Sequence, residues 1–248
     1  MLGLGAAGAR LAADLVAAGA EVHAYDPVAP SAPAGAVRAA DPAAAVASAD
    51  VVLCVAPASA ARGAAAAALP ALSAGAVYAD LNTAAPGLKR ELAALAGEAG
   101  VAFADVALLG PVPARGLATP ALTSGSGATA FAAVLGPLGM PVEVVSAAAG
   151  DAAALKLLRS VFMKGLAAAV LESLAAAEAA GHAGWLERQL GEAIGPALVE
   201  RLVEGSRRHA VRRVEEMDAA CELLVSLGVE PRIAAASRAV LAEIGDLE

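Results

Sequence analysis

Residues Gly3-Leu4-Gly5-Ala6-Ala7-Gly8 decide the fold, because they match the pattern G-x-G-x-x-G of the turn that joins a first strand to a helix. In such a turn the first glycine permits the tight bend, the second lets a pyrophosphate approach the backbone, and the third lets the helix pack closely on the strand. The positive end of the following helix then holds the phosphates. The sequence therefore predicts that Gly3, Leu4, Gly5, Ala6, Ala7 and Gly8 bind a dinucleotide.

An acidic residue strengthens this prediction. Asp26 ends the next apolar run, Glu21–Tyr25, at the distance where a carboxylate can accept hydrogen bonds from the adenosine ribose. The alternative is a glycine-rich turn that binds nothing, and Asp26 argues against it. No Arg or Lys follows Asp26 directly, so the residues favour NAD over NADP, and NADP stays open. Two further residues are assigned to the cofactor site: Ala56 and Pro57.

Short apolar runs alternate with Ala-rich helical stretches through the first half of the chain, which is typical of βαβ units and a parallel sheet. Helices are predicted to begin near Ala7, Ala43, Ala60 and Pro86. Only Met1 and Leu2 precede the fingerprint, so we expect either a clipped first strand or a chain that starts upstream. The predicted strands are Met1–Leu4, Glu21–Tyr25, Val51–Val55, Val77–Asp80, Ala102–Asp105, Leu122–Ser124 and Val142–Val145.

The second half shows no strand pattern. Asp151 can cap a helix that runs to Ala180, and because this helix is apolar nearly all round we expect protein to bury most of it. Further helices are predicted over 185–190, 196–227 and 232–244. The predicted fold is α/β: a Rossmann-type domain over residues 1–149, followed by an all-α domain over 150–248.

Composition excludes several classes of protein. The chain has 248 residues and a net charge of −8, which argues against a nucleic-acid surface. Arg10 and Asp14 interrupt what would be the apolar part of a signal peptide, and we expect no membrane span. The two cysteines, Cys54 and Cys221, form neither a disulfide framework nor a metal-binding spacing, so a reducing cytoplasm and no metal are expected.

Lysine is rare in this chain. Only Lys89, Lys156 and Lys164 occur, and two of them lie on the helix that begins at Asp151. A lysine, unlike an arginine, can give up its proton near neutral pH when it is desolvated. Lys156 is therefore a candidate for the group that accepts a hydroxyl proton during hydride transfer. Ser160 shares its helical face, and Lys164 would support the site or bind an anion. The alternative is that both lysines snorkel or pair with a carboxylate.

Four motifs in this order resemble the β-hydroxyacid dehydrogenase family, which includes 3-hydroxyisobutyrate and 6-phosphogluconate dehydrogenases. Besides the fingerprint, residues 80–86 are similar to D-x-(S/N)-(S/T)-x-x-P, residues 103–111 to F-x-D-A-P-V-S-G-G, and residues 150–156 to G-x-x-x-x-x-K. The resemblance implies that Lys156 is the general acid/base and that Asn82 and Thr83 lie near the nicotinamide and substrate. It also implies that the region around Gly110 lines the substrate pocket.

The departures from the family pattern concern the substrate. Leu109 replaces the serine that would hold a substrate carboxylate, Pro111 replaces the second glycine, and Ser160 replaces an asparagine. Glu215 and Glu216 align loosely with a usual Lys-Asp pair. Anion binding would then fall to arginines near the C-terminus, with Arg213 sharing a helical face with His209 and Glu216. The alternative is that Arg207, Arg208, Arg212 and Arg213 pair with Glu204, Glu215 and Glu216 on a solvated helix.

These observations predict an NAD(P)-dependent oxidoreductase that transfers a hydride between nicotinamide and a small hydroxy acid, with Lys156 as acid/base. The competing hypotheses are an imine reductase, a sugar-acid dehydrogenase, and a sensor that binds NAD(H) without turnover. The expected partner is a small anionic substrate, and the expected assembly is a homodimer, because a short helical domain leaves apolar surface that a second copy would cover.

Overall fold

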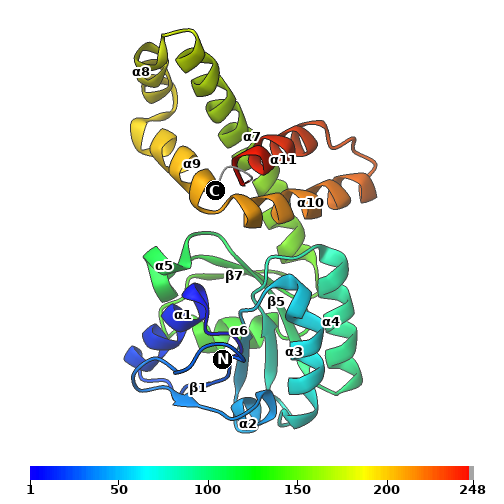
Figure 1. The fold of residues 1–248 in the computed structure, drawn as a ribbon. Coiled ribbons are helices and arrows are strands. Elements are labelled where there is room, and N and C mark those ends of the chain that lie inside the picture. The colour runs from blue at the N-terminus through cyan, green and yellow to red at the C-terminus, as the bar shows by residue number, and fades with distance from the viewer. Residues whose placement is uncertain (246–248) are drawn as a thin grey trace. The chain divides into compact units, whose positions relative to one another are not determined.

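The computed structural model describes residues 1–245, and the chain forms two compact units, Met1–Lys156 and Leu157–Glu248 (Figure 1). The boundary predicted after residue 149 lies directly before helix α7 (Asp151–Ala179), whereas the division between the units lies inside that helix. The sequence distinguishes an α/β part from an all-helical part, and the two units have these two characters.

The first unit is built on a five-stranded sheet whose strands follow one another in sequence order. Neighbouring strands in it are parallel except β5 and β6, so the predicted parallel sheet is found with one antiparallel pair in it. The segment between those two strands, residues 109–120, contains helix α5 (Val112–Arg115) and a turn of 3-10 helix (Gly116–Ala118), so the two strands are not joined by a tight hairpin turn. The strands are β3 (Val51–Cys54), β4 (Val77–Asp80), β5 (Ala102–Leu108), β6 (Ala121–Ser124) and β7 (Val142–Ser146).

The predicted first strand is reduced to a bridge at Leu2. This residue pairs in parallel with both Tyr25 and Cys54, so it links β3 to strand β1 (His23–Ala24). The amide of Leu2 donates to the carbonyl of Leu53 at 2.9 Å. Strand β1 pairs in turn with β2 (Val37–Arg38), which the sequence did not predict. Leu2 therefore lies between β1 and β3, where a Rossmann sheet has its central strand.

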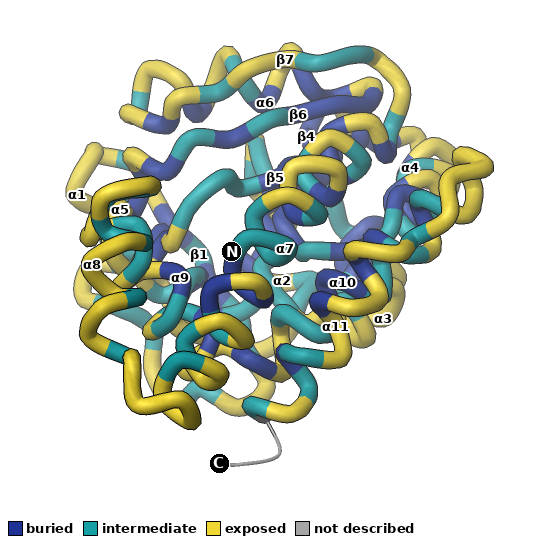
Figure 2. The backbone as a smooth tube through the Cα atoms, turned by 90° about the horizontal axis from the view of Figure 1, so that it is seen from above, coloured by how far each residue is buried: buried dark blue, intermediate teal, exposed yellow. Residues whose placement is uncertain are grey.

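Helices cover both faces of this sheet. Successive residues of β3 point to opposite sides, with Leu53 in one buried cluster and Val52 in the other. Leu11 of α1 packs in the first cluster and Leu92 of α4 in the second, and Figure 2 shows this buried interior. The helices are α1 (Ala6–Ala17), α2 (Pro42–Val46), α3 (Ala61–Ala68) and α4 (Pro86–Glu98), which begin close to the predicted positions, and α5 (Val112–Arg115) and α6 (Ala128–Leu135), which were not predicted.

The second unit is helical throughout its described residues, and its core includes Ala167, Val170 and Leu202. The single helix predicted over 196–227 was wrong, because the chain breaks at His209, where φ is −133° and ψ is 29°. No Gly or Pro marks this break, so the sequence carried no signal for it. After α7 come α8 (Ala183–Ile194), α9 (Pro196–Arg208), α10 (Ala210–Ser226) and α11 (Arg232–Gly245).

Helix α7 is less buried than predicted. Phe162 is 69% exposed, Leu155 44% and Leu158 41%, so one copy of the chain leaves an apolar strip of this helix uncovered. By length and composition alone α7 could also cross a membrane, and it is the one such helix among residues 1–245. The core helix of a soluble protein meets the same description, so this helix is only weak evidence against the expectation that the chain has no membrane span.

Candidate active site

The backbone of the fingerprint has the shape that a dinucleotide needs. Gly3 has φ +97°, and a Cβ there would lie 2.1 Å from the carbonyl oxygen of Val55. A Cβ on Gly8 would lie 2.0 Å from the carbonyl oxygen of Gly3, so helix α1 approaches the strand as closely as the motif requires. A Cβ on Gly5, in contrast, would meet nothing within 4 Å. Because no side chain caps the start of α1, its amides and this open side suit a pyrophosphate.

Asp26 lies beside the fingerprint. Its Oδ2 accepts a hydrogen bond from the amide of Leu4 at 2.7 Å, and its Oδ1 accepts from the amides of Val28 and Ala29, each at 2.8 Å. Partial burial opposes ionisation, but these three amides outweigh it and hold the pKa of Asp26 below its usual range. The carboxylate is therefore charged and fixed, and a lone pair on Oδ2 remains to accept a hydrogen bond from a ribose hydroxyl.

The structure places Arg38 next to Asp26, which sequence reasoning missed. Its Nη2 donates to the carbonyl oxygen of Asp26 at 3.2 Å. The inference for NAD considered only the residues directly after Asp26, whereas Arg38 reaches this place through the pairing of β1 with β2. A guanidinium here can take a 2′-phosphate, so both forms of the cofactor have a chemical partner at this edge.

Two of the other predicted cofactor residues are brought together at the ends of β3 and β4. The amide of Ala56 donates to Oδ1 of Asn82 at 2.6 Å, and Nδ2 of Asn82 donates to Oδ2 of Asp80 at 2.7 Å. Pro57 follows Ala56 and precedes a short turn of 3-10 helix, Ala58–Ala60. Val55, against which Gly3 packs, joins this group to the fingerprint, so the predicted cofactor residues occupy one edge of the sheet.

Lys156 and Thr83 meet in the first unit. Nζ of Lys156 donates to Oγ1 of Thr83 at 2.7 Å. The approach depends on Gly150, directly before α7, which has φ +100° and on which a Cβ would lie 3.0 Å from the carbonyl oxygen of Pro86. The glycine and the lysine of the motif at 150–156 thus have separate roles, one in packing α7 against the start of α4 and one in placing an ammonium group beside Thr83.

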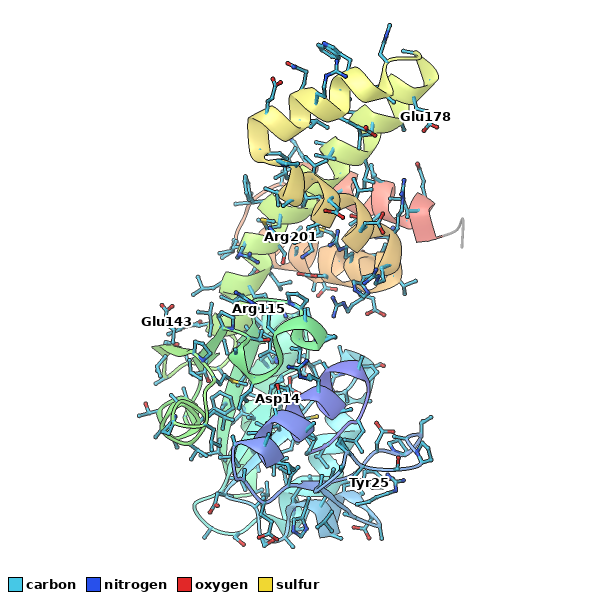
Figure 3. The ribbon with its side chains drawn as sticks, turned by 90° about the vertical axis from the view of Figure 1, so that its left-hand side faces the viewer. Asp14, Tyr25, Arg115, Glu143, Glu178 and Arg201 are labelled. Atoms are coloured by element: carbon cyan, nitrogen blue, oxygen red, sulfur yellow. The ribbon has the colours of Figure 1, made fainter. Side chains whose placement is uncertain are left out.

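The segment that replaces the family's substrate loop carries an arginine that the sequence did not single out. Leu109 supplies no hydroxyl, and its amide donates to the carbonyl oxygen of Pro120 at 2.8 Å. A Cβ on Gly110 would lie 3.4 Å from Cδ and 3.6 Å from Nη1 of Arg115. The side chain of Arg115 therefore lies next to Gly110. Arg115, labelled in Figure 3, is exposed on the short helix α5.

The predicted substrate residues of the second unit form a cluster of their own. Ser160 donates to Oε1 of Glu216, and Nζ of Lys164 lies 2.9 Å from the same oxygen. Burial lowers the pKa of Lys164, with help from Arg213 and Arg212 and against the effect of Glu216. The structure thus pairs Glu216 with a lysine and a serine, as the alternative for Lys164 expected.

Of the arginines near the C-terminus, Arg213 has different neighbours from those predicted, whereas Arg207 pairs as one alternative expected. Nη1 of Arg213 donates to Oγ of Ser206 at 2.5 Å, and the expected helical face shared with His209 is wrong because His209 lies in the break before α10. Arg207 pairs with Glu204 at 3.7 Å, as the solvated-helix alternative expected for that arginine.

The fold and the fingerprint together define a dinucleotide-binding protein of the Rossmann type. Residues 1–138 match the model of the NAD-binding domain of 6-phosphogluconate dehydrogenase, and residues 177–244 match a domain of unknown function. The first match covers more than half of the chain. The chain therefore belongs to the β-hydroxyacid dehydrogenase family.

Two similar proteins at 30% identity or more carry names without an activity. An uncharacterised 28.5 kDa protein of Methanothermus fervidus is 30% identical over 158 residues, which are 62% of this chain and 61% of that protein, so the alignment spans less than two thirds of either. A conserved hypothetical protein of Sinorhizobium meliloti is 31% identical, with a TM-score of 0.77 over 97% of this chain and 86% of that one.

Two enzymes of known class share the fold at lower identity. A 3-hydroxyisobutyrate dehydrogenase of Salmonella typhimurium is 18% identical, with a TM-score of 0.83 over 99% of this chain and 93% of that one. A reductive aminase of Aspergillus terreus, solved with NADPH and ethyl levulinate, is 23% identical, with a TM-score of 0.69 over 98% and 91%. At these identities, 18% and 23%, the similarity shows a shared fold and nothing about activity.

Proposed function

We propose that the protein is a nicotinamide-dependent oxidoreductase that acts on a small hydroxy acid, with Lys156 as general acid/base. The observation that carries the proposal is the 2.7 Å hydrogen bond between Nζ of Lys156 and Oγ1 of Thr83. It places an ammonium group and a hydroxyl at one point of the unit that holds the fingerprint. In the oxidative direction the neutral amine form of Lys156 takes the proton of the substrate hydroxyl, and in the reductive direction the ammonium form returns that proton.

The cofactor proposed is NAD, with NADP as the alternative that Arg38 supports. Gly3, Leu4, Gly5, Ala6, Ala7 and Gly8 would hold the pyrophosphate, and Asp26 the adenosine ribose. Ala56, Pro57 and Asn82 would line the nicotinamide end. Bound there, the nicotinamide would accept or donate the hydride.

The substrate proposed is an anion that approaches Thr83, Leu109 and Gly110. Since Leu109 cannot bind a carboxylate, we assign that role to Arg115, whose side chain lies along Gly110. A guanidinium can hold a carboxylate through two hydrogen bonds. Ser160, Lys164 and Arg213 remain proposed as supporting residues, although Lys164 already has a carboxylate partner in Glu216.

The test combines binding and turnover. NADH is titrated by its fluorescence, and a panel of hydroxy acids is screened for absorbance change at the nicotinamide band. Lys156→Met should keep NADH affinity and lose turnover by about 100- to 10,000-fold, the range typical of a lost general acid or base. The matched control is Arg159→Met, which removes an exposed charge from the same helix and should change neither quantity. Unchanged turnover in Lys156→Met would overturn the role of this lysine.

A second candidate is reduction of an imine, which the fold shared with a reductive aminase supports. Repeating the screen with ketone and amine pairs in the presence of NADPH distinguishes it from hydroxy-acid oxidation. A third candidate, a sensor without turnover, is favoured by the missing substrate-loop serine. It predicts NADH binding with no absorbance change across both panels.

We also propose that the protein is a cytoplasmic homodimer. The exposed strip of Leu155, Leu158 and Phe162 on α7 supports a second copy as its cover, since large apolar side chains are unfavourable in water. Light scattering should give the mass of two chains. Phe162→Lys places a charge in the apolar strip, so the measured mass should fall toward that of one chain.

A further inference from the structure

A fully buried lysine lies between two buried carboxylates in the first unit. Lys89 is 0% exposed, and its Nζ lies 2.5 Å from Oδ1 of Asp80 and 3.2 Å from Oδ1 of Asp105. The same nitrogen donates to the carbonyl oxygen of Asp80 at 2.9 Å. Both carboxylates are also 0% exposed. Burying three charges carries a large desolvation cost, so their arrangement needs an explanation beyond packing.

The Asp80 side of this cluster leads to the nicotinamide end of the proposed cofactor site. While Oδ1 of Asp80 faces Lys89, its Oδ2 accepts a hydrogen bond from Nδ2 of Asn82 at 2.7 Å. This bond orients the Asn82 amide so that its Oδ1 accepts from the amide of Ala56 at 2.6 Å. Thr83 is the next residue along the chain, so Asp80 holds the segment from which Thr83 projects.

The Asp105 side leads to the start of helix α7. Oδ2 of Asp105 accepts hydrogen bonds from the amides of Gly150 at 3.1 Å and Ala153 at 3.0 Å. It also accepts from Oγ of Ser124 at 3.2 Å, and that oxygen accepts from the amide of Ala152 at 3.0 Å. The first amides of a helix have no partner within it, and a carboxylate at that end is favoured by the helix dipole. Asp105 and Ser124 therefore cap α7 from another part of the chain.

The hydrogen bonds of Asp80 and those of Asp105 lead to the two partners of one further bond, Thr83 and Lys156. Asp80 holds the segment of Thr83, and Asp105 holds the first turn of the helix that carries Lys156 one turn later. Lys89 places a positive charge between the two carboxylates, which would otherwise face each other without a counter-ion.

We infer that Lys89, Asp80 and Asp105 form a positioning cluster that sets the distance between Thr83 and Lys156. The inference rests on the proposed function for its consequence in catalysis, and on the hydrogen bonds above for its geometry. A cluster that served folding alone would, when altered, lower stability and leave the environment of Lys156 as it was.

The chain offers an experiment that needs no substrate. Since it contains three lysines, protein labelled with ¹⁵N-lysine gives three side-chain ammonium signals, which single variants Lys156→Met and Lys164→Met assign. In Asp105→Asn the signals of Lys89 and Lys156 should both move, whereas that of Lys164 stays. Amide hydrogen exchange at Gly150 and Ala153 should accelerate about tenfold or more, because the acceptor of both bonds is altered.

The matched control is Asp151→Asn, which changes an exposed carboxylate in the same first turn that bonds to Ser146 rather than to the cluster. It should leave the Lys156 signal and the exchange of Ala153 unchanged. If Asp105→Asn does not fold, Ser124→Ala replaces it, with Ser146→Ala as its control. Ser124→Ala should then accelerate exchange at Ala152 and move the Lys156 signal.

The inference is overturned if the Lys89 signal moves in Asp105→Asn while the Lys156 signal and the exchange at the start of α7 do not. In the Ser124→Ala version, an unmoved Lys156 signal has the same meaning. Failure of the proposed function looks different: the wild type then turns over no substrate, while the effects of Asp105→Asn on Lys156 remain. Where turnover is found, Asp105→Asn should lower kcat more than it changes the affinity for NADH.

Discussion

Thr83 and Lys156 are separated by 73 positions in the chain, and yet the lysine Nζ donates to the threonine hydroxyl at 2.7 Å. One follows strand β4 and the other lies in the second turn of α7. The bond joins the two motifs that the family resemblance assigned to the reacting end of the site, and it makes the proposed chemistry testable residue by residue.

Removing the Thr83 hydroxyl should impair the placement of Lys156. Thr83→Val keeps the size of the side chain and removes the acceptor, so turnover should fall about 10-fold or more with NADH affinity unchanged. Steady-state kinetics and NADH fluorescence measure the two quantities. The control is Thr123→Val, a buried threonine whose Oγ1 has no hydrogen-bond partner in the structure, and which should therefore fold and turn over as the wild type does. Equal effects of the two variants would contradict the role of Thr83.

The choice of cofactor should depend on Asp26 and Arg38. The wild type should bind NADH more tightly than NADPH, because the Asp26 carboxylate accepts ribose hydroxyls and repels a 2′-phosphate. Asp26→Ser should weaken NADH binding and strengthen NADPH binding. Arg38→Gln should weaken NADPH alone, and an equal loss for both cofactors would argue against a 2′-phosphate at this residue.

The glycines of the fingerprint should respond differently to alanine. Gly8→Ala should destabilise the fold, because the new Cβ would lie 2.0 Å from the carbonyl oxygen of Gly3. Gly5→Ala has open space around the Cβ, so the protein should fold normally and lose NADH affinity. Thermal unfolding and NADH titration separate the two cases. Gly63→Ala, also open but on helix α3, is the control and should bind NADH normally with stability equal or raised by about 0.5–1 kcal/mol.

Arg115 should determine the affinity for the substrate anion. Arg115→Gln removes the positive charge beside Gly110, so KM for a hydroxy acid should rise by about 10-fold or more while kcat changes less. Initial rates over a range of substrate concentrations give both constants. Arg62→Gln, which alters an exposed arginine of the same unit that pairs with Glu91, should leave KM unchanged. A KM unaffected by Arg115→Gln would exclude Arg115 as the carboxylate ligand.

Stability at high pH should depend on the ammonium group of Lys89. Burial lowers the pKa of Lys89, but the Asp80 and Asp105 carboxylates outweigh it and raise the pKa above the usual 10.5. The folded state therefore holds this proton more tightly than the unfolded state, and the contribution is complete below pH 10.5 and is lost as pH rises through the folded pKa. Urea unfolding on both sides of that pH should show the decline. The double variant Lys89→Met, Asp105→Asn should lack it, and an identical decline in the variant would contradict the prediction.

Much of the first unit was predictable from local patterns. Strand β4 has the predicted bounds, and the helices after the glycine and proline turns begin near the predicted residues, because hydrophobic periodicity and turn residues are local signals. The break at His209 was not predictable in this way, since no Gly or Pro marks it and only packing among helices decides it. The antiparallel pairing of β5 with β6 was likewise not predictable, because the segment between them carries no tight-turn signal and contains helix α5 and a turn of 3-10 helix.

The sequence by itself determined the dinucleotide fingerprint with its acidic residue Asp26, the α/β and all-helical parts, and the identity of Lys156 as a candidate, because each depends on residue type at short spacing. Tertiary structure decided what lies beside those residues. Arg38 reaches Asp26 through the pairing of β1 with β2, and Lys89 on α4 lies between Asp80 and Asp105 on the neighbouring strands β4 and β5. Each such neighbour depends on strand pairing and helix packing, so no local pattern in the sequence carries it.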